Sequence, residues 1–261
     1  MRRPYLTLVA VFVTWGSIPL IVRSVALPAP AIVAVRLWIA SAVLAAAIRV
    51  APRSGNEPRL LSVRPGRCIT VSAILAVHWT ALFEAYKRAP AATVILIVYL
   101  APVGVAAIAP RVLGESVGRR TVAALAAGLA GFVLVVGRGV QRADGAGLVF
   151  AVVAAVTFVA FVVLSKPLAE AYGGLRLAFL EMTGAGILLI PVALGQAWGP
   201  PRAVWLWLIV LGAVHTGFGI ALYMGALARV PATHVGVLGY IEPASVVVCG
   251  WIVLGQTPSP A

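Results

Sequence analysis

Charged residues are scarce in this chain. Only 10% of its 261 residues are Asp, Glu, Lys or Arg, and 62% are hydrophobic, whereas soluble domains carry about 25% charged residues. Acidic residues are the rarest, since seven Asp and Glu stand against 20 Lys and Arg, for a net charge of +13. This composition excludes an ordinary soluble domain and indicates a membrane protein.

Cysteine and the motifs of intramembrane catalysis are also scarce. Of the two cysteines, Cys68 lies at the cytoplasmic start of the apolar run 68–86 and Cys249 lies within the run 232–253, so no structural disulfide is expected. No His-x-x-x-His motif and no pair of aspartates occurs, so an enzyme would have only isolated glutamates for its acid chemistry. We therefore expect no metal and no cofactor, and we rank an intramembrane enzyme as the less favoured function.

Long apolar runs are what the chain does have. A membrane helix needs about 20 mostly apolar residues to cross the hydrocarbon layer. Nine stretches meet this length: 5–22, 30–49, 68–86, 91–110, 121–138, 145–165, 174–197, 203–228 and 232–253. Arg2 and Arg3 give the first stretch the look of a secretory signal, but its apolar run continues without a cleavage site. The sequence predicts an all-α polytopic bundle of about nine transmembrane helices.

The basic residues are distributed unevenly between the predicted loops. With the N-terminus in the cytoplasm, thirteen Lys and Arg fall on the cytoplasmic side and six on the other, which is the bias that sets membrane orientation. No aromatic residues alternate with them as in nucleic-acid-binding surfaces. We therefore expect the lipid bilayer and a small-molecule substrate as partners, no nucleic acid, and Ala261 outside the cytoplasm.

One segment occurs twice. Arg88 to Glu115 aligns without a gap on Arg229 to Gln256, with ten of 28 positions identical. The copies lie five spans apart, and an odd number of spans places them in opposite orientations, as in secondary transporters. We predict two inverted five-helix repeats, residues 1–142 with spans 1–5 and residues 143–261 with spans 6–9.

A proline interrupts each copy near its middle. Pro102 and Pro243 remove the helical hydrogen bonds to the carbonyls of Val98 and Gly239. Each carbonyl must then find another partner or face a cavity. A packing kink explains a single proline equally well, but two prolines at symmetric positions favour a cavity.

Several short motifs, taken in order, resemble one family. They are Trp15-Gly16-Ser17, Arg36, Phe83-Glu84-Ala85-Tyr86-Lys87, Tyr99-Leu100-Ala101-Pro102, Leu113-Gly114-Glu115, Ala226-Leu227-Ala228-Arg229, Tyr240-Ile241-Glu242-Pro243 and Leu254-Gly255-Gln256. Together they resemble the EamA-type branch of the drug/metabolite transporter superfamily. The resemblance implies a ten-helix inner-membrane transporter with two inverted five-helix repeats that moves small organic metabolites, often outward.

Two departures from this pattern affect the prediction. Gln256 stands where the family pattern has glutamate, and the chain ends at the position equivalent to Arg120. We therefore expect nine helices of ten, with the last helix absent. Five glycines on spans 8 and 9 would then be left facing lipid, namely Gly217, Gly219, Gly225, Gly236 and Gly239. A second copy of the chain, forming a homodimer, would cover them, or transport would be weak.

Polar and aromatic residues deep in the spans are the candidates for a site. Glu242, near the middle of span 9, either binds a proton or a cationic group or only stabilises the broken helix. His78 and His215 occupy related spans and either face one cavity or are satisfied core residues. The predicted substrate-binding residues are Trp15, His78, Tyr99, His215, Tyr240 and Glu242.

Two other glutamates are weaker candidates. Glu84 has Lys87 and Arg88 at helical spacing, which favours a solvated ion pair, and pairing with Arg36 is the alternative. Glu181 is expected to be reached by water. The function that these features favour is a secondary transporter, exporting a small metabolite such as an amino acid or an amphipathic drug by alternating access. An incomplete copy that is structural or inactive is the alternative.

Overall fold

The structure is a computed structural model that describes residues 2–25, 27–51, 64–136, 144–195 and 202–254. All regular structure in these ranges is helical, which confirms the all-α fold class. The elements are α1 (Arg2–Trp15), α2 (Ile18–Ser24), α3 (Ala29–Val50), α4 (Pro65–Arg88), α5 (Ala91–Val98), α6 (Ala101–Leu113), α7 (Arg119–Val136), α8 (Gly145–Tyr172), α9 (Gly174–Leu188), α10 (Ile190–Leu194), α11 (Arg202–Val210), η2 (Leu211–Phe218), α12 (Gly219–Leu227), α13 (Ala232–Gly239) and α14 (Ile241–Leu254).

Seven helical stretches of the described chain are long and apolar enough to cross a membrane. They are Arg2–Val22, Ala29–Val50, Pro65–Arg88, Ala92–Leu113, Gly145–Tyr172, Val204–Leu227 and Ala232–Cys249. The predicted spans 121–138 and 174–197 are not among the seven. Both extend past the described residues, and both are helical where they are described, as α7 and as α9 with α10. The chain is a multi-pass membrane protein.

Several of these stretches are broken inside the bundle. The break between α1 and α2 falls at Gly16 and Ser17, the one between α5 and α6 follows Val98, and the one between α13 and α14 falls at Tyr240. A proline occurs in the first turn after each break, where its missing N–H leaves no hydrogen bond unmade. Helical geometry therefore resumes directly after each interruption.

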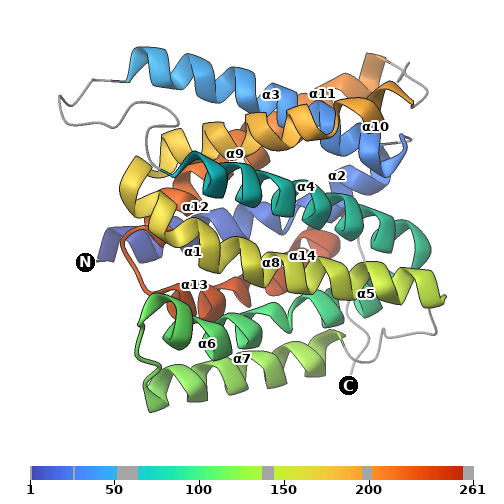
Figure 1. Ribbon diagram of the computed structural model, residues 1–261. Coiled ribbons are helices and arrows are strands. Elements are labelled where there is room, and N and C mark those ends of the chain that lie inside the picture. The colour runs from blue at the N-terminus through green and yellow to red at the C-terminus, as the bar shows by residue number, and fades with distance from the viewer. Residues whose placement is uncertain (1, 26, 52–63, 137–143, 196–201, 255–261) are drawn as a thin grey trace.

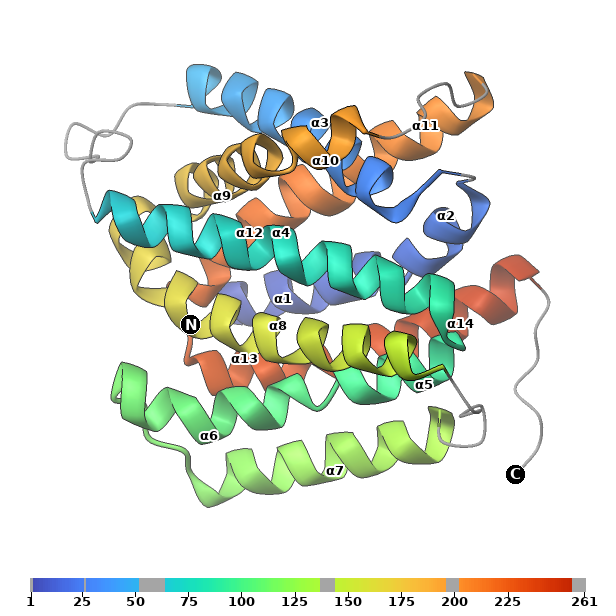
Figure 2. The same ribbon diagram turned by 45° about the vertical axis from the view of Figure 1, so that its right-hand side comes forward.

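Helices from the two halves of the chain pack against each other. Helix α4 packs along α8, α3 packs against η2 and α9, and α1 lies between α12 and α14. Helix α6 packs against α13, and α7 contacts α13 and α5 at the lower edge of the bundle (Figures 1 and 2). The interior is therefore built jointly by the first and second halves.

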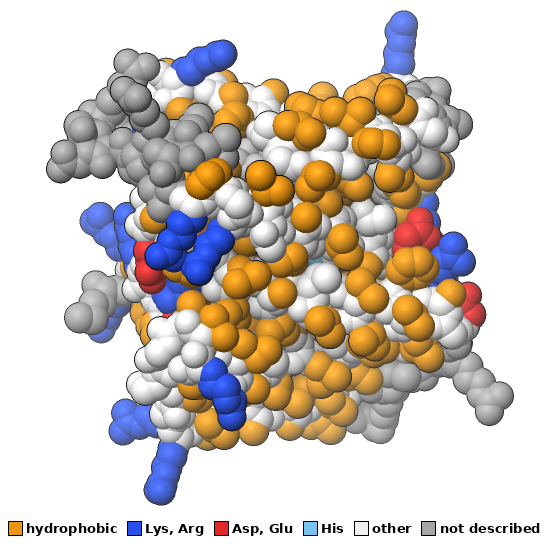
Figure 3. Space-filling model, in the orientation of Figure 1, with side chains coloured by type: hydrophobic (Ala, Val, Ile, Leu, Met, Phe, Trp, Pro, Cys, Tyr) orange, Lys and Arg blue, Asp and Glu red, His pale blue; other side chains and the backbone are white. Residues whose placement is uncertain are grey.

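The surface separates apolar from basic side chains. Figure 3 shows hydrophobic side chains over the middle of the visible face and Lys and Arg mainly at the two edges toward which the helix ends point, with more on the left. Large apolar side chains such as Leu134, Val156 and Leu206 are more than half exposed. Such a surface suits hydrocarbon rather than water.

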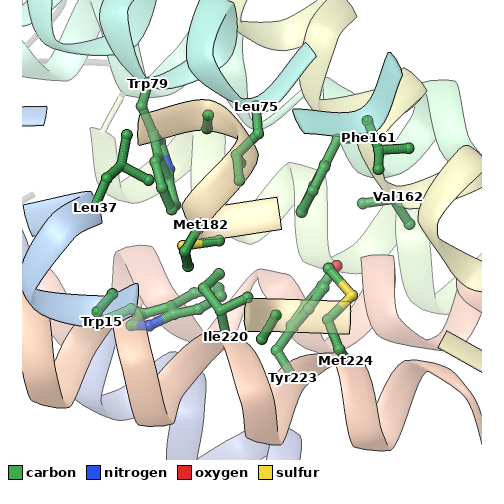
Figure 4. Close-up of a cluster of buried hydrophobic side chains, with 14 of the residues drawn as sticks. Trp15, Leu37, Leu75, Trp79, Phe161, Val162, Met182, Ile220, Tyr223 and Met224 are labelled. Atoms are coloured by element: carbon green, nitrogen blue, oxygen red, sulfur yellow. The ribbon is translucent and has the colours of Figure 1, made fainter. Parts of the chain in front are cut away.

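The central core is an aromatic and aliphatic cluster contributed by both halves. In Figure 4, Trp79 and Leu75 of α4 lie across from Trp15 of α1 and Tyr223 of α12, with Met182 of α9 between them. The buried cluster is continuous through most of the bundle. Since lipid is as apolar as these side chains, close packing rather than exclusion of water holds such helices together.

The five glycines expected to face lipid face other helices of the same chain, so that expectation was wrong. Outside the glycine's own helix, the atoms nearest to a Cβ placed at each position belong to Ala40 for Gly217, Trp15 for Gly219, Gly174 for Gly225, Pro102 for Gly236 and Phe12 for Gly239. Small residues allow helix axes to approach closely, and here they do so within one chain. The residues after Leu254 lie outside the described part of the chain, and so does Ala261, whose location was predicted from the sequence.

Candidate functional site

A cavity of about 120 Å³ lies inside the bundle between the two halves. Its wall is formed by α1 to α6, α8, α12, α13 and α14. The lining residues of α4 run from Leu75, near the middle of that helix, to Tyr86 in its last turn, and those of α6 are Pro102 and Val105, in its first half. The cavity is therefore displaced toward the end of the bundle where α4 terminates.

Aromatic side chains make up much of the wall, and three charged or titratable side chains interrupt it. The aromatic residues are Phe12, Trp15, Trp79, Phe83, Tyr86, Tyr99, Phe158, Phe161 and Tyr223. The three others are Arg36, His78 and Glu242. A mostly apolar pocket with a few converging polar groups is typical of small-molecule binding sites.

Four of the six predicted site residues line this cavity, and two do not. Trp15, His78, Tyr99 and Glu242 border it, together with Pro102. His215 lies behind Trp15, and Tyr240 borders a separate, shallower groove with Val13 and Ser245, among others. Pro243 is buried but is not part of the cavity wall.

Glu242 and Tyr99 approach each other from the two copies of the repeated segment. Glu242 belongs to the first turn of α14, and Tyr99 is the C-cap residue that follows α5. The Tyr99 hydroxyl lies close enough to the Glu242 carboxyl to interact with it. Glu242 makes no ion pair within the described chain, so its carboxyl remains available to a ligand or a proton.

His78 is fixed by one ring nitrogen. Its Nδ1 lies 2.9 Å from the Ala154 carbonyl oxygen, and because a carbonyl can only accept, Nδ1 carries a hydrogen. The ring packs against Phe158, with 5.3 Å between the ring centroids. Nε2 has no hydrogen-bond partner among the described residues, so it is the nitrogen that a ligand can contact.

His215 supports the cavity wall from outside. It lies in the π-helix η2, where Nδ1 is 3.2 Å from the Val210 carbonyl and Nε2 is 2.8 Å from Ser17 Oγ. Its own carbonyl accepts a 2.8 Å hydrogen bond from Trp15 Nε1. The proposal that His78 and His215 face one cavity was therefore wrong, because both ring nitrogens of His215 point to other partners.

Tyr240 supports the break in the other copy of the repeat. Its hydroxyl donates a 3.1 Å hydrogen bond to the Tyr99 carbonyl, which lies at the end of α5. The two tyrosine rings and Phe132 of α7 form a cluster with centroid separations of 5.3 to 6.3 Å. Tyr240 thus positions Tyr99 and does not reach the cavity itself.

Arg36 is the residue that the sequence reasoning missed as a site residue. It is only 3% exposed, and Nε donates a 2.9 Å hydrogen bond to Thr216 Oγ1. The guanidinium lies 4.0 Å from the centroid of the Trp79 ring and 5.4 Å from that of Phe83. A charge inside a bilayer costs about 2.5–3.5 kcal/mol on insertion scales, and that general cost was the available signal for a special role.

The two remaining glutamates have partners of their own. Glu84 pairs with Arg88 at 3.3 Å, as the helical spacing predicted, so the alternative pairing with Arg36 was wrong. Glu181 has no exposed surface and accepts a 2.7 Å hydrogen bond from Ser165 Oγ. The expectation that water reaches Glu181 was therefore wrong as well.

A second polar cluster is centred on Lys166, in the last two turns of α8. Lys166 Nζ donates hydrogen bonds to the carbonyls of Leu227 (3.0 Å) and Val230 (2.8 Å) and lies 3.6 Å from Glu115 Oε1. The same Glu115 oxygen accepts a 2.9 Å hydrogen bond from the Ala232 backbone N–H. The cluster joins α8 to the residues after α6 and to the connection between α12 and α13, at the end away from the cavity.

Catalytic arrangements receive little support from the described residues. No group of three or more His, Cys, Asp or Glu suited to a metal occurs there. Gly114, Ser116 and Gly118 have the Gly-x-Ser-x-Gly spacing of hydrolase nucleophiles, but that motif requires a turn between a strand and a helix. Here the segment connects α6 to α7, and Ser116 is exposed.

Comparisons with known proteins agree with this architecture. The EamA-like transporter family matches residues 2–137 and 145–261. A probable terminal-alkyne amino-acid exporter of Streptantibioticus cattleyicolor is 26% identical over 230 residues, which cover 86% of this chain and 76% of that relative. The threonine/homoserine exporter RhtA of Escherichia coli is 27% identical over 134 residues, covering 49% of this chain and 44% of RhtA.

A solved structure shows the same fold. A crystal structure with 23% sequence identity superposes with a TM-score of 0.83, covering 99% of this chain and 91% of the other. The likeness therefore extends over both halves of the bundle rather than over one group of helices.

Proposed function

Because this chain belongs to the EamA-like transporter family, we propose that it exports an amino acid or a related amphipathic metabolite through the central cavity by alternating access. The observation that carries the proposal is the cavity itself, in which an apolar aromatic wall surrounds Arg36, His78 and Glu242. The similar proteins are described as amino-acid exporters, so amino acids are the first substrates to test.

Transport by alternating access needs a substrate site that opens to one side at a time. The cavity is displaced toward one end of the bundle, while Lys166 and Glu115 join three segments at the other end. Opening the Lys166 cluster would expose the cavity to the side of the membrane on which that cluster lies. This asymmetry supports an assignment of the structure to a state that is closed at the Lys166 end.

The proposed membrane topology has nine spans and two inverted repeats. The repeated segments α5–α6 and α13–α14 run in opposite directions in Figure 1, and each is broken at its Tyr-x-x-Pro sequence. The excess of basic side chains on the left edge in Figure 3 supports a cytoplasmic location for that end. The N-terminus then lies in the cytoplasm and Ala261 outside it.

Glu242 is the proposed coupling residue. It lines the cavity, has no ion-pair partner in the described chain, and lies next to the Tyr99 hydroxyl. A carboxyl in such a position binds either a proton or a cationic group of the substrate, and intramembrane acids serve both roles in transporters. Competition between proton and substrate for one carboxyl would couple export to proton entry.

Efflux from proteoliposomes tests the proposal. Vesicles that contain the purified chain are loaded with labelled threonine, homoserine, leucine or tryptophan, and a pH gradient is imposed across the membrane. We expect saturable efflux of at least one of these, abolished by dissipation of the gradient, and none from protein-free vesicles. The absence of efflux for all four, together with that of a set of amphipathic drugs, contradicts the proposal and favours an inactive or structural chain.

The topology and the oligomeric state have separate tests. A reporter fused after Ala261 is expected to be active only outside the cytoplasm, and cytoplasmic activity contradicts nine spans. A homodimer remains a proposal, although the glycines first cited for it pack within the chain. Efflux at full rate from a demonstrated monomer would remove it.

A further inference from the structure

We propose that Arg36 and Glu242 form a two-point site for a zwitterionic amino acid with an apolar side chain. Arg36 binds the α-carboxylate, Glu242 binds the α-ammonium group, and the aromatic wall receives the side chain. This inference rests on the proposed function, since it names the substrate class of the same cavity. It assigns a role to a buried arginine that no other group in the described chain neutralises.

The guanidinium of Arg36 is only partly used by the protein. Nε donates a hydrogen bond to Thr216 Oγ1, and the guanidinium carbon lies over the Trp79 ring. The two terminal nitrogens have no hydrogen-bond partner among the described residues, and no carboxylate of that part of the chain lies within 4.0 Å. Arg36 borders the cavity, so a ligand there meets two free donors.

The surroundings of Arg36 favour an anion as that ligand. A guanidinium presents paired N–H groups that match the two oxygens of a carboxylate. His78 and His215 lie close enough to Arg36 to interact with its charge, and neither histidine brings a negative charge. A buried unpaired charge is strongly unfavourable in a membrane, so an entering carboxylate supplies the missing partner.

Glu242 supplies the complementary charge from another helix. It comes from α14, whereas Arg36 comes from α3, and the two side chains form no ion pair with each other. Both side chains border the same cavity, so a ligand held there can contact each of them. A zwitterion is the ligand class that satisfies both at once without adding net charge to the bilayer interior.

The remaining wall selects the side chain of the ligand. Trp15, Trp79 and Tyr223 are among the aromatic residues around the cavity, and Leu75 and Ile220 add aliphatic surface. Apart from the three charged or titratable residues, polar atoms in the lining are confined to the tips of Trp and Tyr and to the backbone. The Trp15 N–H is already bonded to the His215 carbonyl. An apolar side chain therefore fits this wall better than a polar one.

Displacement of radiolabelled leucine from the purified full chain tests the two contacts separately. The competitors are unlabelled leucine, leucinamide, isoamylamine and 4-methylpentanoate. Leucinamide has a neutral amide in place of the carboxylate, isoamylamine lacks the carboxylate altogether, and 4-methylpentanoate lacks the ammonium group. We expect each of the three analogues to displace the label at least about tenfold less well than leucine, as loss of a charged hydrogen bond predicts.

Two variants assign the contacts to residues. In Arg36→Gln, the affinity for leucine is expected to fall to that for isoamylamine, while the affinity for isoamylamine stays within about threefold of the unmodified protein, a change of less than one hydrogen bond. In Glu242→Gln, the affinity for leucine is expected to fall to that for 4-methylpentanoate. Arg88→Gln removes an exposed arginine paired with Glu84 and serves as the matched control, with all four ligands unchanged.

Three results would overturn the inference. They are equal binding of leucine and isoamylamine by the unmodified protein, no saturable leucine binding, and unchanged discrimination in a folded Arg36→Gln variant. The first two do not depend on how the variants fold. If binding shows the expected preferences but proteoliposomes export nothing, the proposed function fails and the site remains. If amines that lack a carboxylate are exported at the same rate as leucine, the proposed export function is supported but the two-point site is contradicted.

Discussion

The two Tyr-x-x-Pro segments share a backbone arrangement but present different chemistry to the cavity. Both divide a helical stretch, after Val98 in the first copy and at Tyr240 in the second. The first copy contributes Tyr99 and Pro102 to the cavity wall, and the second contributes Glu242. Glu242 aligns with Ala101, so one position of the repeat carries the charge in only one half. The repeated segments share the breaks, and the difference at this one position places a carboxyl at the cavity wall.

The tyrosines extend this contrast. Tyr99 lines the cavity beside Glu242, whereas Tyr240 donates its hydroxyl hydrogen to the Tyr99 carbonyl. The two equivalent tyrosines therefore differ in role. Tyr99 faces the cavity, whereas Tyr240 packs behind it, and Phe132 of α7 contacts both rings. Variants made in pairs, one in each copy, separate the contribution of the cavity from that of the support.

The largest effect is expected from Glu242→Gln. The amide keeps the size of the side chain but neither releases a proton nor balances a cation, so proton-driven efflux should fall by about tenfold or more, the equivalent of one charged hydrogen bond. Proteoliposome efflux at several pH values measures it. Glu84→Gln, at an exposed ion pair, is the control and should leave efflux unchanged. A Glu242→Gln variant with the pH dependence of the unmodified protein would remove the coupling role.

A smaller and divided effect is expected from the tyrosine pair. Tyr99→Phe removes the hydroxyl beside Glu242 and should lower efflux, with little change in stability. Tyr240→Phe removes one hydrogen bond to a backbone carbonyl, which should lower the unfolding free energy by about 1 kcal/mol and leave efflux near normal. Efflux and thermal unfolding in detergent measure the two quantities. Equal loss of efflux in both variants would contradict the distinction between wall and support.

For the two prolines, as for the two tyrosines, we expect the substitution in the first copy to lower efflux more than the one in the second copy. Pro102→Ala and Pro243→Ala each restore an N–H and make a continuous helix across the break accessible, because proline disfavours a helix interior by about 3 kcal/mol relative to alanine. We expect both variants to fold and both to transport more slowly. Pro102→Ala should have the larger effect, since Pro102 borders the cavity and Pro243 does not. Efflux rates at equal protein content compare them, and faster efflux in Pro102→Ala contradicts a role for the break.

The sequence predicts the helices and their breaks for simple reasons. A run of about 20 apolar residues has to be helical in a bilayer, because every backbone group must be bonded within its own segment. The breaks at Tyr99 and Tyr240 are foreseeable because proline marks them. Trp15, His78, Tyr99 and Glu242 were found because aromatic, titratable or charged residues stand out in an apolar span.

The errors have a common physical origin. Which face of a helix meets which neighbour depends on contacts between segments far apart in the chain, such as Arg36 with Trp79 and Thr216. His215 lies in the π-helix η2, and the additional residue in a π turn rotates the side chains relative to an α-helix. Helical spacing alone therefore places His215 on the wrong side. Tyr223 and Phe161 of the aromatic wall were missed for the same reason, since neither carries a sign of its orientation in the local sequence.

The smallest effects are expected at two glycines of α13, which have the larger residues Ile95 and Val98 as counterparts in the first copy. An added Cβ at Gly236 would lie 3.3 Å from Pro102 Cα and Cβ, whereas one at Gly239 would lie 3.9 Å from Phe12 Cζ. Alanine is favoured over glycine in a helix by about 0.5–1 kcal/mol, and overpacking costs about 1–3 kcal/mol. Gly239→Ala should therefore be neutral or slightly stabilising, while Gly236→Ala should lower stability by about 1 kcal/mol, with the difference between these two terms setting the sign. Thermal unfolding of both variants in the same detergent measures the difference.

Because Gly236 also borders the cavity, its alanine variant should also lose some efflux. A Gly236→Ala protein as stable and as active as Gly239→Ala would show that α13 and α6 do not need this close approach.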